Sequence, residues 1–166
     1  MLKLFLLRHA KSSWQDVTLD DFERPLKENG LKEASFMGGV YNKFCDSMPD
    51  AVISSPARRA LETAQLFAKE IDYPLKKIIL QQNIYGATSE ELFEVLRDIG
   101  DEYKNVVMVG HNPGFTELAN HIIDGVAIDN IPTCGLLGIE FDVKNWKKIE
   151  EKSGKLFCFE YPKKYS

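Results

Sequence analysis

Short, continuous apolar runs alternate along this chain with longer segments whose apolar residues recur at helical spacing. Residues 2–7 and 106–109 are apolar almost without interruption, as in strands that are buried on both faces. Residues 31–44 and 56–71 carry apolar side chains three or four positions apart, which predicts amphipathic helices. Strands that alternate with helices in this way predict an α/β fold with a largely parallel sheet.

The rest of the chain continues the same order. Further elements are predicted as a strand at 51–54, a strand at 77–80, a helix at 89–99 and a helix at 115–123. Two late strands, 136–141 and 156–161, follow each other with no helix between them, so part of the sheet is expected to be antiparallel. Gly154 is expected in the turn before the last strand.

Local signals mark the starts of two helices. Ser54 or Ser55 is a natural N-cap for the helix over 56–71, and Pro56 suits its first turn. Ser89 is the expected cap of the helix over 89–99.

Size and charge narrow the classes of function. The 166 residues are the length of one ordinary domain, and we expect a single domain over 1–166. With 21 basic and 25 acidic side chains the formal net charge is −4, which offers no general attraction to nucleic acid or to an anionic membrane. If the protein handles an anion, its positive charge must be concentrated locally.

Cysteine usage and the N-terminus bear on location. The odd number and wide spacing of Cys45, Cys134 and Cys158 argue against a disulfide framework or a zinc site and favour buried free thiols. The apolar stretch 1–7 is short, runs directly into Arg8 and lacks a small-residue cleavage site, so it does not resemble a signal peptide. No apolar run approaches the roughly 20 residues that span a bilayer, and we expect a cytoplasmic protein.

Two of the three histidines directly follow apolar strands. His9 comes after the first run and His111 after the run at 106–109. The carboxyl ends of parallel strands share one edge of a sheet, where ligands bind at a switch in strand order. Either histidine alone could be an ordinary strand-end residue, but the pair, flanked by Arg8 and Gly110, favours a site. His121 lies off the apolar face of its helix and is expected at the surface.

Basic residues at two strand-to-helix junctions suit a phosphate group. Arg8 offers a planar fork for phosphate oxygens. Arg58 and Arg59 begin a predicted helix, beside N–H groups that bind anions, and one of the two is expected to be solvated. The chain has neither a Gly-Lys-Ser/Thr phosphate loop nor a Gly-x-Ser-x-Gly elbow, and the histidines lack metal-like spacing, so no metal site is expected.

Three motifs resemble those of the histidine phosphatase superfamily, which includes the phosphoglycerate mutases. Arg8-His9-Ala10 resembles its Arg-His-Gly signature, with Ala in place of the usual Gly. Residues 55–63, Ser-Pro-Ala-Arg-Arg-Ala-Leu-Glu-Thr, resemble its Ser-x-x-x-Arg-Ala-x-x-Thr motif, which selects Arg59 rather than Arg58. Gly110-His111 resembles the second-histidine motif. The compact length, Asp21-x-x-Arg24-Pro25-Leu26 with Gly30, and residues 110–114 look most like SixA-type phosphohistidine phosphatases.

The resemblance covers nearly the whole chain and implies both a fold and a mechanism. The implied fold has three α/β/α layers around a mostly parallel sheet of about five to six strands, as in phosphoglycerate mutases. In the implied mechanism neutral His9 attacks phosphorus and becomes phosphohistidine, with its other ring nitrogen donating to a backbone carbonyl. Arg8, Arg59 and His111 hold the phosphoryl oxygens, and water then hydrolyses the intermediate. No metal or other cofactor is required, because the arginines supply the positive charge.

One departure from the family bears on the substrate. Residues 80–87 resemble the segment that carries the general-acid Glu of phosphoglycerate mutases, and Gln82 takes that position if Tyr85-Gly86 sets the register. Glutamine cannot donate a titratable proton, and an alkoxide leaving group without its acid loses about 10²–10⁴-fold in rate. A phosphoramidate such as phosphohistidine needs that acid less. Three nearby residues remain alternative acids: Asp16, Asp20 and Glu23.

The resulting hypothesis is a phosphatase that removes phosphate from phosphohistidine in a protein, at an open site without a long lid. Lys11, Asn112 and Gln82 are further candidate substrate contacts. The alternatives are a small-molecule phosphomonoester phosphatase or mutase, with the missing Glu against a mutase, and a non-catalytic phosphoprotein-binding module. The expected partner is a phosphorylated protein or small substrate, with neither nucleic acid nor membrane.

Overall fold

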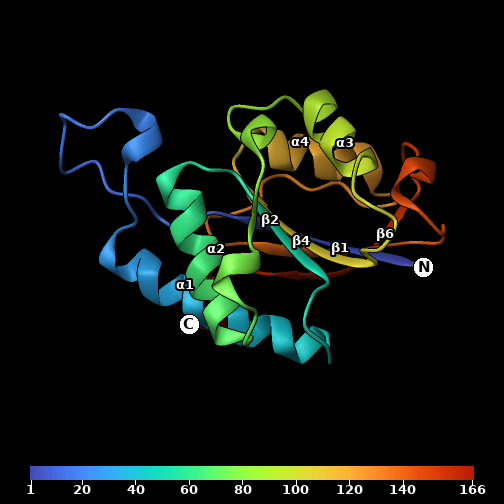
Figure 1. Cartoon of the computed structure of the whole chain (residues 1–166), viewed down its shortest axis with the longest axis horizontal. Coiled ribbons are helices and arrows are strands. Elements are labelled where there is room, and N and C mark those ends of the chain that lie inside the picture. Colours follow the sequence, from blue (N-terminus) through green and yellow to red (C-terminus); the bar gives the residue numbers. More distant parts are fainter.

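The computed structural model describes residues 1–166 and consists of one sheet between two layers of helices (Figure 1). The strands are β1 (Leu2–Arg8), β2 (Ala51–Ser54), β3 (Ile79–Leu80), β4 (Asn105–Gly110), β5 (Leu136–Phe141) and β6 (Gly154–Glu160). The α-helices are α1 (Glu28–Phe44), α2 (Arg58–Glu70), α3 (Ser89–Arg97) and α4 (Gly114–Ile122). Short 3₁₀ turns lie at η1 (Asp21–Glu23), η2 (Leu75–Lys77), η3 (Gln82–Ile84), η4 (Trp146–Lys148) and η5 (Pro162–Tyr165).

The six strands follow the order β3-β2-β4-β1-β5-β6. The β3–β2, β2–β4 and β4–β1 pairs are parallel, whereas β5 runs antiparallel to both β1 and β6. The three-layer α/β/α prediction with about five to six strands is therefore confirmed, as is the antiparallel pairing of the late strands.

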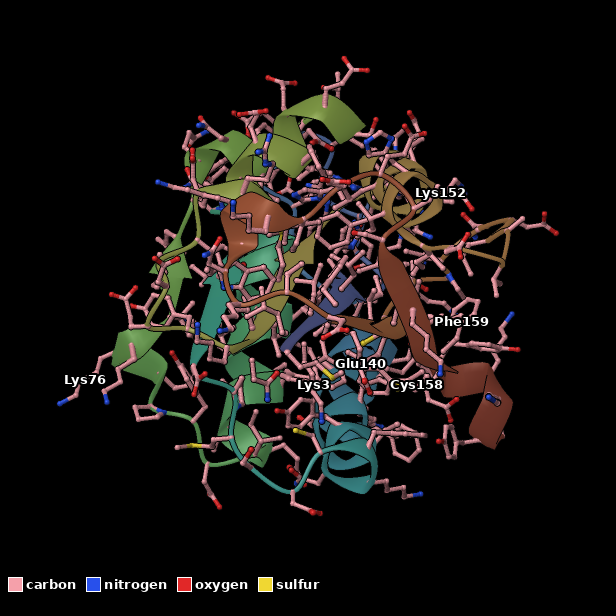
Figure 2. The ribbon with its side chains drawn as sticks, turned by 90° about the vertical axis from the view of Figure 1, so that its right-hand side faces the viewer. Lys3, Lys76, Glu140, Lys152, Cys158 and Phe159 are labelled. Carbon is pink, nitrogen blue, oxygen red and sulfur yellow. The ribbon has the colours of Figure 1, made fainter.

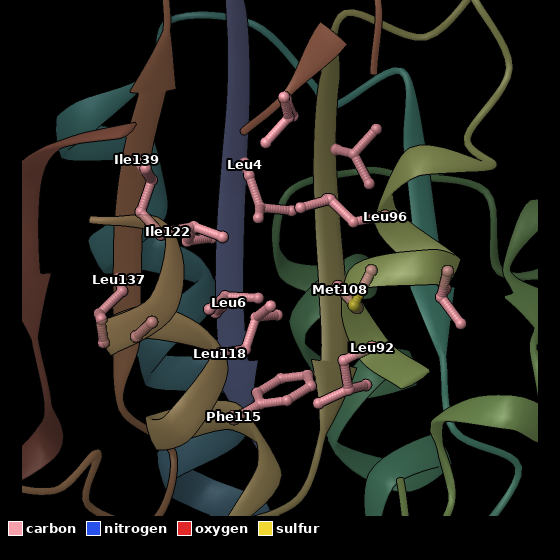
Figure 3. Close-up of a cluster of buried hydrophobic side chains, with 14 of the residues drawn as sticks. Leu4, Leu6, Leu92, Leu96, Met108, Phe115, Leu118, Ile122, Leu137 and Ile139 are labelled. Atoms are coloured by element: carbon pink, nitrogen blue, oxygen red, sulfur yellow. The ribbon is translucent and has the colours of Figure 1, made fainter. Parts of the chain in front are cut away.

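Each central strand contributes side chains to two separate cores. Leu4 and Leu6 of β1 pack with Met108 of β4 beneath α3 and α4 (Figure 3), and Phe5 and Leu7 pack on the opposite side against α1 and α2. Both faces of the sheet are thus covered, which explains why the strands read as unbroken apolar runs. Burial of each such side chain stabilises the fold by about 1.5–3 kcal/mol relative to exposure.

The pairing of β1 with β4 places two strand ends at one level. Arg8 is the register partner of Gly110, so the residues that follow them, His9 and His111, leave the sheet side by side. The helices that follow the two strands lie on opposite faces: α1 covers one face after β1, and α4 covers the other after β4 (Figure 1). This is a topological switch point, where α/β sheets bind their ligands.

Helix starts differ from the sequence prediction. α1 begins at Glu28, three residues before the predicted start. Ala57, rather than Ser54 or Ser55, is the N-cap of α2, because the Ser55 hydroxyl accepts from the Ala57 N–H and lies against a histidine. The cap of α3 is Thr88 rather than Ser89, in a reciprocal capping box with Glu91.

Two strand boundaries also differ. β3 contains only Ile79 and Leu80, because residues 75–77 form a 3₁₀ turn. Gly154 begins β6 opposite Phe141 instead of lying in the preceding turn. A Cβ at Gly154 would come within 2.7 Å of the Ile139 side chain and 2.8 Å of the Phe141 ring, so the close packing of this strand start explains the glycine.

The three cysteines are free and buried, as expected, and Cys158 lies on β6 at the edge of the sheet (Figure 2). None of the helices is both long enough and apolar enough to cross a lipid bilayer.

Gly30 of α1 sets how closely this helix approaches the loop after His9. A Cβ at this position would lie 2.5 Å from the Lys11 carbonyl oxygen, which also accepts the Lys27 N–H. We expect Gly30→Ala to lower the free energy of unfolding by about 1–3 kcal/mol, because helix and loop must separate.

Gly39 on the same helix is the matched control, because nothing lies within 4 Å of its added Cβ. Gly39→Ala is expected to raise the free energy of unfolding by about 0.5–1 kcal/mol. Urea denaturation measures both changes. Equal effects of the two substitutions would contradict the close contact at Gly30.

Candidate active site

A cleft of about 420 Å³ opens where β1 and β4 end. Its lining includes the four principal residues expected from the sequence: Arg8, His9, Arg59 and His111. The other lining residues are Lys11, Ser12, Trp14, Arg24, Lys27, Asn112 and Thr133. β1 ends at Arg8, and both Arg8 and His9 line the cleft.

Backbone hydrogen bonds hold His9 from both sides. Its N–H donates to the Gly110 carbonyl at 3.0 Å, and its carbonyl accepts the Cys134 N–H at 3.0 Å. The ring nitrogen Nδ1 lies 2.7 Å from the Ala10 carbonyl oxygen. A carbonyl can only accept, so Nδ1 carries the proton in the neutral ring and Nε2 keeps its lone pair. That tautomer is the one a nucleophilic imidazole requires.

Thr63 of α2 holds the peptide that orients His9. The Ala10 N–H donates to Thr63 Oγ1 at 3.0 Å, and the Thr63 hydroxyl donates to the Arg59 carbonyl at 2.8 Å. All three groups are buried. The sequence marked Thr63 only as part of a motif, because its contact with Ala10 joins residues that are 53 positions apart.

The two histidine rings face each other, with ring centroids 5.2 Å apart. The pKa of His9 is lowered to about 3, mainly by burial. The hydrogen bond to Ala10 opposes this shift, and the nearby His111, Arg59 and Arg8 add to it. Burial, followed by the Arg59 charge, lowers the pKa of His111 to about 4. Both rings are therefore neutral near pH 7 in the free protein.

Ser55 positions the His111 ring. Its hydroxyl oxygen lies 2.7 Å from His111 Nε2 and accepts the Ala57 N–H at 3.2 Å. Tyr85 packs edge-on against the same ring, with centroids 5.6 Å apart. The sequence pointed to Ser55 as a possible helix cap, and its contact with the histidine depends on the pairing of β2 with β4.

Both phosphate-binding candidates among the arginines are held by backbone carbonyls. Arg8 Nη1 donates to the Ile131 carbonyl at 2.7 Å, and Arg59 Nη1 donates to the Asp21 carbonyl at 2.7 Å. Arg8 Nε and Arg59 Nε are buried without a hydrogen-bond partner, as is Arg24 Nη1. Such unpaired donors are costly, and an oxyanion in the cleft they line could satisfy them. Arg58 is the exposed member of its pair and contacts Glu62 instead.

Asp21 is a site-edge residue whose role the sequence did not predict. Its carboxylate accepts from the Tyr85 hydroxyl at 2.7 Å and from Arg59 Nη2 at 3.0 Å, and it lies 3.4 Å from Arg24 Nε. Partial burial raises the pKa of the Asp21 carboxyl, but the Tyr85 and Arg59 hydrogen bonds and the two arginine charges outweigh this, so the pKa is lowered overall. Asp21 is therefore ionised near pH 7, and an ionised carboxylate has no proton to donate.

The three acids considered from the sequence do not line the cleft. Asp16 instead accepts from Thr18, and Asp20 caps the η1 turn by accepting the Glu23 N–H. The only available signal for Asp21 was its place in the Asp21-x-x-Arg24 motif.

The structure places two of the three additional substrate-contact candidates in the cleft and the third outside it. Lys11 and Asn112 line the cleft, but the Asn112 amide nitrogen donates to Asn130 and Ile131. Gln82 is exposed on η3 and is not among the lining residues, whereas Tyr85 of the same segment reaches the site edge. His121 lies outside the cleft and is half-buried against Phe93 rather than fully solvated.

The cleft lining is basic and contains no carboxyl group. Its ionisable side chains are five cations, Arg8, Lys11, Arg24, Lys27 and Arg59, and the two neutral imidazoles. No group of three or more His, Cys, Asp or Glu side chains is arranged to hold a metal ion. The arrangement can bind an oxyanion such as a phosphoryl group and present the lone pair of a neutral imidazole to it.

Comparison with known proteins agrees with this chemistry. The model of the histidine phosphatase superfamily (branch 1) matches residues 4–105. An uncharacterized protein of Mycobacterium tuberculosis is 30% identical over 166 residues, which cover 95% of this chain and all of that protein. A 2,3-bisphosphoglycerate-dependent phosphoglycerate mutase of Streptomyces griseus is 35% identical over 107 residues, which cover 60% of this chain and 42% of the mutase.

Solved structures show the same architecture. A protein of Agrobacterium tumefaciens assigned as phosphohistidine phosphatase SixA is 25% identical, with a TM-score of 0.77 over 97% of this chain and 98% of that one. The protein histidine phosphatase SixA in complex with tungstate aligns with a TM-score of 0.83 over 99% of this chain and all of that one, at 18% identity. At 18% identity, the similarity to the tungstate complex shows a shared fold and nothing further.

Thr63→Val tests the hydrogen bond that holds the His9–Ala10 peptide. The substitution keeps the side-chain shape but leaves the Ala10 N–H buried and unpaired, which costs about 1–3 kcal/mol of unfolding free energy. We expect the rate of aryl phosphate hydrolysis to fall by about 10- to 100-fold, because His9 is misplaced. Thr63→Ser keeps the hydroxyl and should retain most of both; similar losses in the two variants would contradict this role.

The lowered pKa values predict how the histidines titrate. His9 and His111 should stay neutral as the pH falls from 8 to 5 in the free protein, and NMR signals assigned with single His→Gln variants measure this. The unfolded chain binds protons below about pH 6.5 that the folded chain does not. The stability contributed by the neutral rings is therefore complete above that pH and is lost as the pH falls toward 4 and 3. Titration of either ring near 6.5 would contradict their burial beside arginines.

Proposed function

Because this chain belongs to the histidine phosphatase superfamily, and its structural neighbours also support a phosphatase, we propose that it hydrolyses phosphohistidine in proteins through a phosphoryl intermediate on His9. A relative assigned as a phosphohistidine phosphatase at 25% identity supports this proposal. The three free thiols also suit the reducing cytoplasm, where we propose that the protein acts.

The observation that carries the proposal is the absence of any carboxyl group from the cleft lining. Hydrolysis of a phosphate ester expels an alkoxide, which needs a proton in the transition state, and removal of the donor costs about 10²–10⁴-fold. The single carboxylate at the edge, that of Asp21, has a lowered pKa and is ionised. An imidazole leaving group whose second nitrogen has taken a proton from solvent departs as a neutral molecule, so it needs no donor in the cleft.

In the first step His9 Nε2 attacks phosphorus in line with the bond to the substrate nitrogen. The new Nε2–P bond forms as the P–N bond of the substrate breaks, and the substrate histidine leaves as neutral imidazole. Nδ1–H stays hydrogen-bonded to the Ala10 carbonyl, which stabilises the positive charge that develops on the His9 ring. Arg8, Arg59 and His111 surround the cleft and are suited to hold the phosphoryl oxygens.

In the second step water attacks phosphorus and the Nε2–P bond breaks. The departing His9 ring retains its Nδ1 proton and again becomes neutral, while the proton lost by water passes to phosphate or solvent. Arg8 keeps its positive charge throughout, because burial lowers its pKa only from a starting value far above 7. Burial is the main cause that keeps the two imidazoles neutral, and the charges of Arg8 and Arg59 add to it.

Comparison of leaving groups tests the proposal. We expect kcat/KM for a phosphohistidine peptide to exceed that for the matching phosphoserine peptide by at least about 10²-fold. The reason is that the cleft offers no proton donor to the alkoxide that leaves from the ester. Among aryl phosphates the rate should rise steeply with the acidity of the phenol. Faster hydrolysis of phosphoserine, or no dependence on phenol acidity, would instead favour a phosphomonoester phosphatase with an acid outside the lining.

The nucleophile is tested with the same substrates. His9→Ala should lose at least about 10³-fold in kcat and should form no alkali-stable, acid-labile phosphoenzyme. His121→Gln is the matched control, since His121 lies outside the cleft, and should keep the wild-type rate. Binding of the phosphopeptide without hydrolysis by the wild type would favour a phosphoprotein-binding module.

A further inference from the structure

A second, larger hollow adjoins the active-site cleft. It has a volume of about 930 Å³ and is lined by residues 13–15, 25–29 and Lys32; we call it the α1 groove. Trp14 and Lys27 line both the cleft and the groove, so the two spaces lie next to each other. Figure 1 shows the chain between β1 and α1, in blue, standing away from the sheet on this side of the molecule. A ligand that fills the cleft could therefore continue along α1.

The combined lining of cleft and groove is strongly basic. The six basic residues are Arg8, Lys11, Arg24, Lys27, Lys32 and Arg59, and the only acidic residue is Glu28. The whole chain has a formal net charge of −4, so this concentration of positive charge opposes the overall balance. Because basic side chains outnumber the acidic one in this lining, the surface attracts ligands of negative charge.

Trp14 stands at the junction of the two spaces. Its side chain is 68% exposed although its ring lies under the Arg24 guanidinium, 3.4 Å from guanidinium carbon to ring centre. A large exposed aromatic side chain in a basic setting is typical of an anchor for a polypeptide. The stacking places the buried Arg24 and the exposed Trp14 together at this junction.

The groove is already formed in the free protein. The Ser13 N–H donates to the Pro25 carbonyl, and the Lys27 N–H donates to the Lys11 carbonyl, each at 2.8 Å. The Leu26 N–H between them donates to Glu62 of α2 at 2.9 Å. These bonds join both walls to the body of the protein, so binding requires little ordering of the groove.

We propose that the α1 groove binds an acidic stretch of the substrate polypeptide next to its phosphohistidine. This inference rests on the proposed function, because a phosphohistidine side chain in the cleft places its flanking residues beside the adjoining groove. Acidic side chains would meet Lys27 and Lys32, and apolar or amide groups would pack on Trp14. The groove thus determines which phosphoproteins are preferred, while the cleft determines the chemistry.

The test compares two phosphohistidine peptides of one length, flanked by Glu or by Lys, with free phosphohistidine. We expect kcat/KM to favour the Glu-flanked peptide by roughly tenfold at low salt, through KM rather than kcat, and the preference to shrink as salt rises. Lys32→Glu should reverse the preference without changing the hydrolysis of free phosphohistidine, because Lys32 lines the groove and not the cleft.

Lys76→Glu is the matched control, because it makes the same charge change at an exposed residue (Figure 2) that lines neither the groove nor the cleft. Equal rates for the two peptides, or equal effects of the Lys32 and Lys76 variants, would overturn the groove proposal while leaving the proposed function intact. If none of the three substrates is hydrolysed, the proposed function is wrong. Binding of a peptide to the protein then tests the groove separately.

Tryptophan fluorescence gives that separate measurement. Of the two tryptophans, Trp146 is fully buried, so a change on peptide binding reports Trp14. Titration with the unphosphorylated Glu-flanked peptide should shift the emission to shorter wavelength in the wild type and not in Trp14→Phe. No shift, or an equal shift with the Lys-flanked peptide, would contradict the proposal. A shift produced only by anionic lipid vesicles would point instead to a membrane surface.

Discussion

The parallel pairing of β1 with β4 is the constraint on which the site depends. Because Arg8 and Gly110 are register partners, the two strands end together and their following histidines come within 5.2 Å, ring centre to ring centre. A slip by one residue would turn each apolar side chain of β1 to the other face. Since α1 and α2 cover one face and α3 and α4 the other, such a slip would disrupt both cores. The packing of the cores therefore fixes the geometry of the cleft.

The electrostatics of the cleft follow from its many basic side chains. The carboxylate that pairs with them, that of Asp21, lies outside the lining. Carbonyl oxygens of Ile131 and Asp21 orient Arg8 and Arg59 without neutralising them, and the Asp21 carboxylate contacts Arg59 only from the edge. The remaining positive charge and the burial together lower the pKa values of both histidines. One arrangement thus prepares the site for an anion and keeps an imidazole nucleophilic.

Much of this was predictable from local patterns. The apolar runs of β1 and β4 and the spacing in α2 gave the layers of the fold, since burial on both faces leaves a clear mark in a strand. Arg8, His9, Arg59 and His111 were recognisable because each lies at a strand end or helix start within a short motif. Segment boundaries were less predictable: a single side chain such as Thr88 or Ser55 decides where a helix begins.

The sequence by itself determined the fold class and the four principal site residues, because these depend on residue type and local spacing. It also showed glutamine at position 82, in the segment that resembles the one carrying the general-acid Glu of the mutases. Only the tertiary structure decided that Thr63 holds the Ala10 peptide, that Ser55 contacts His111 and that Asp21 links Arg59 to Tyr85. These contacts join residues 38 to 64 positions apart, and no local pattern encodes such distances. The carboxyl-free cleft and its position beside the α1 groove arise in the same way, from segments that meet only when the sheet has formed.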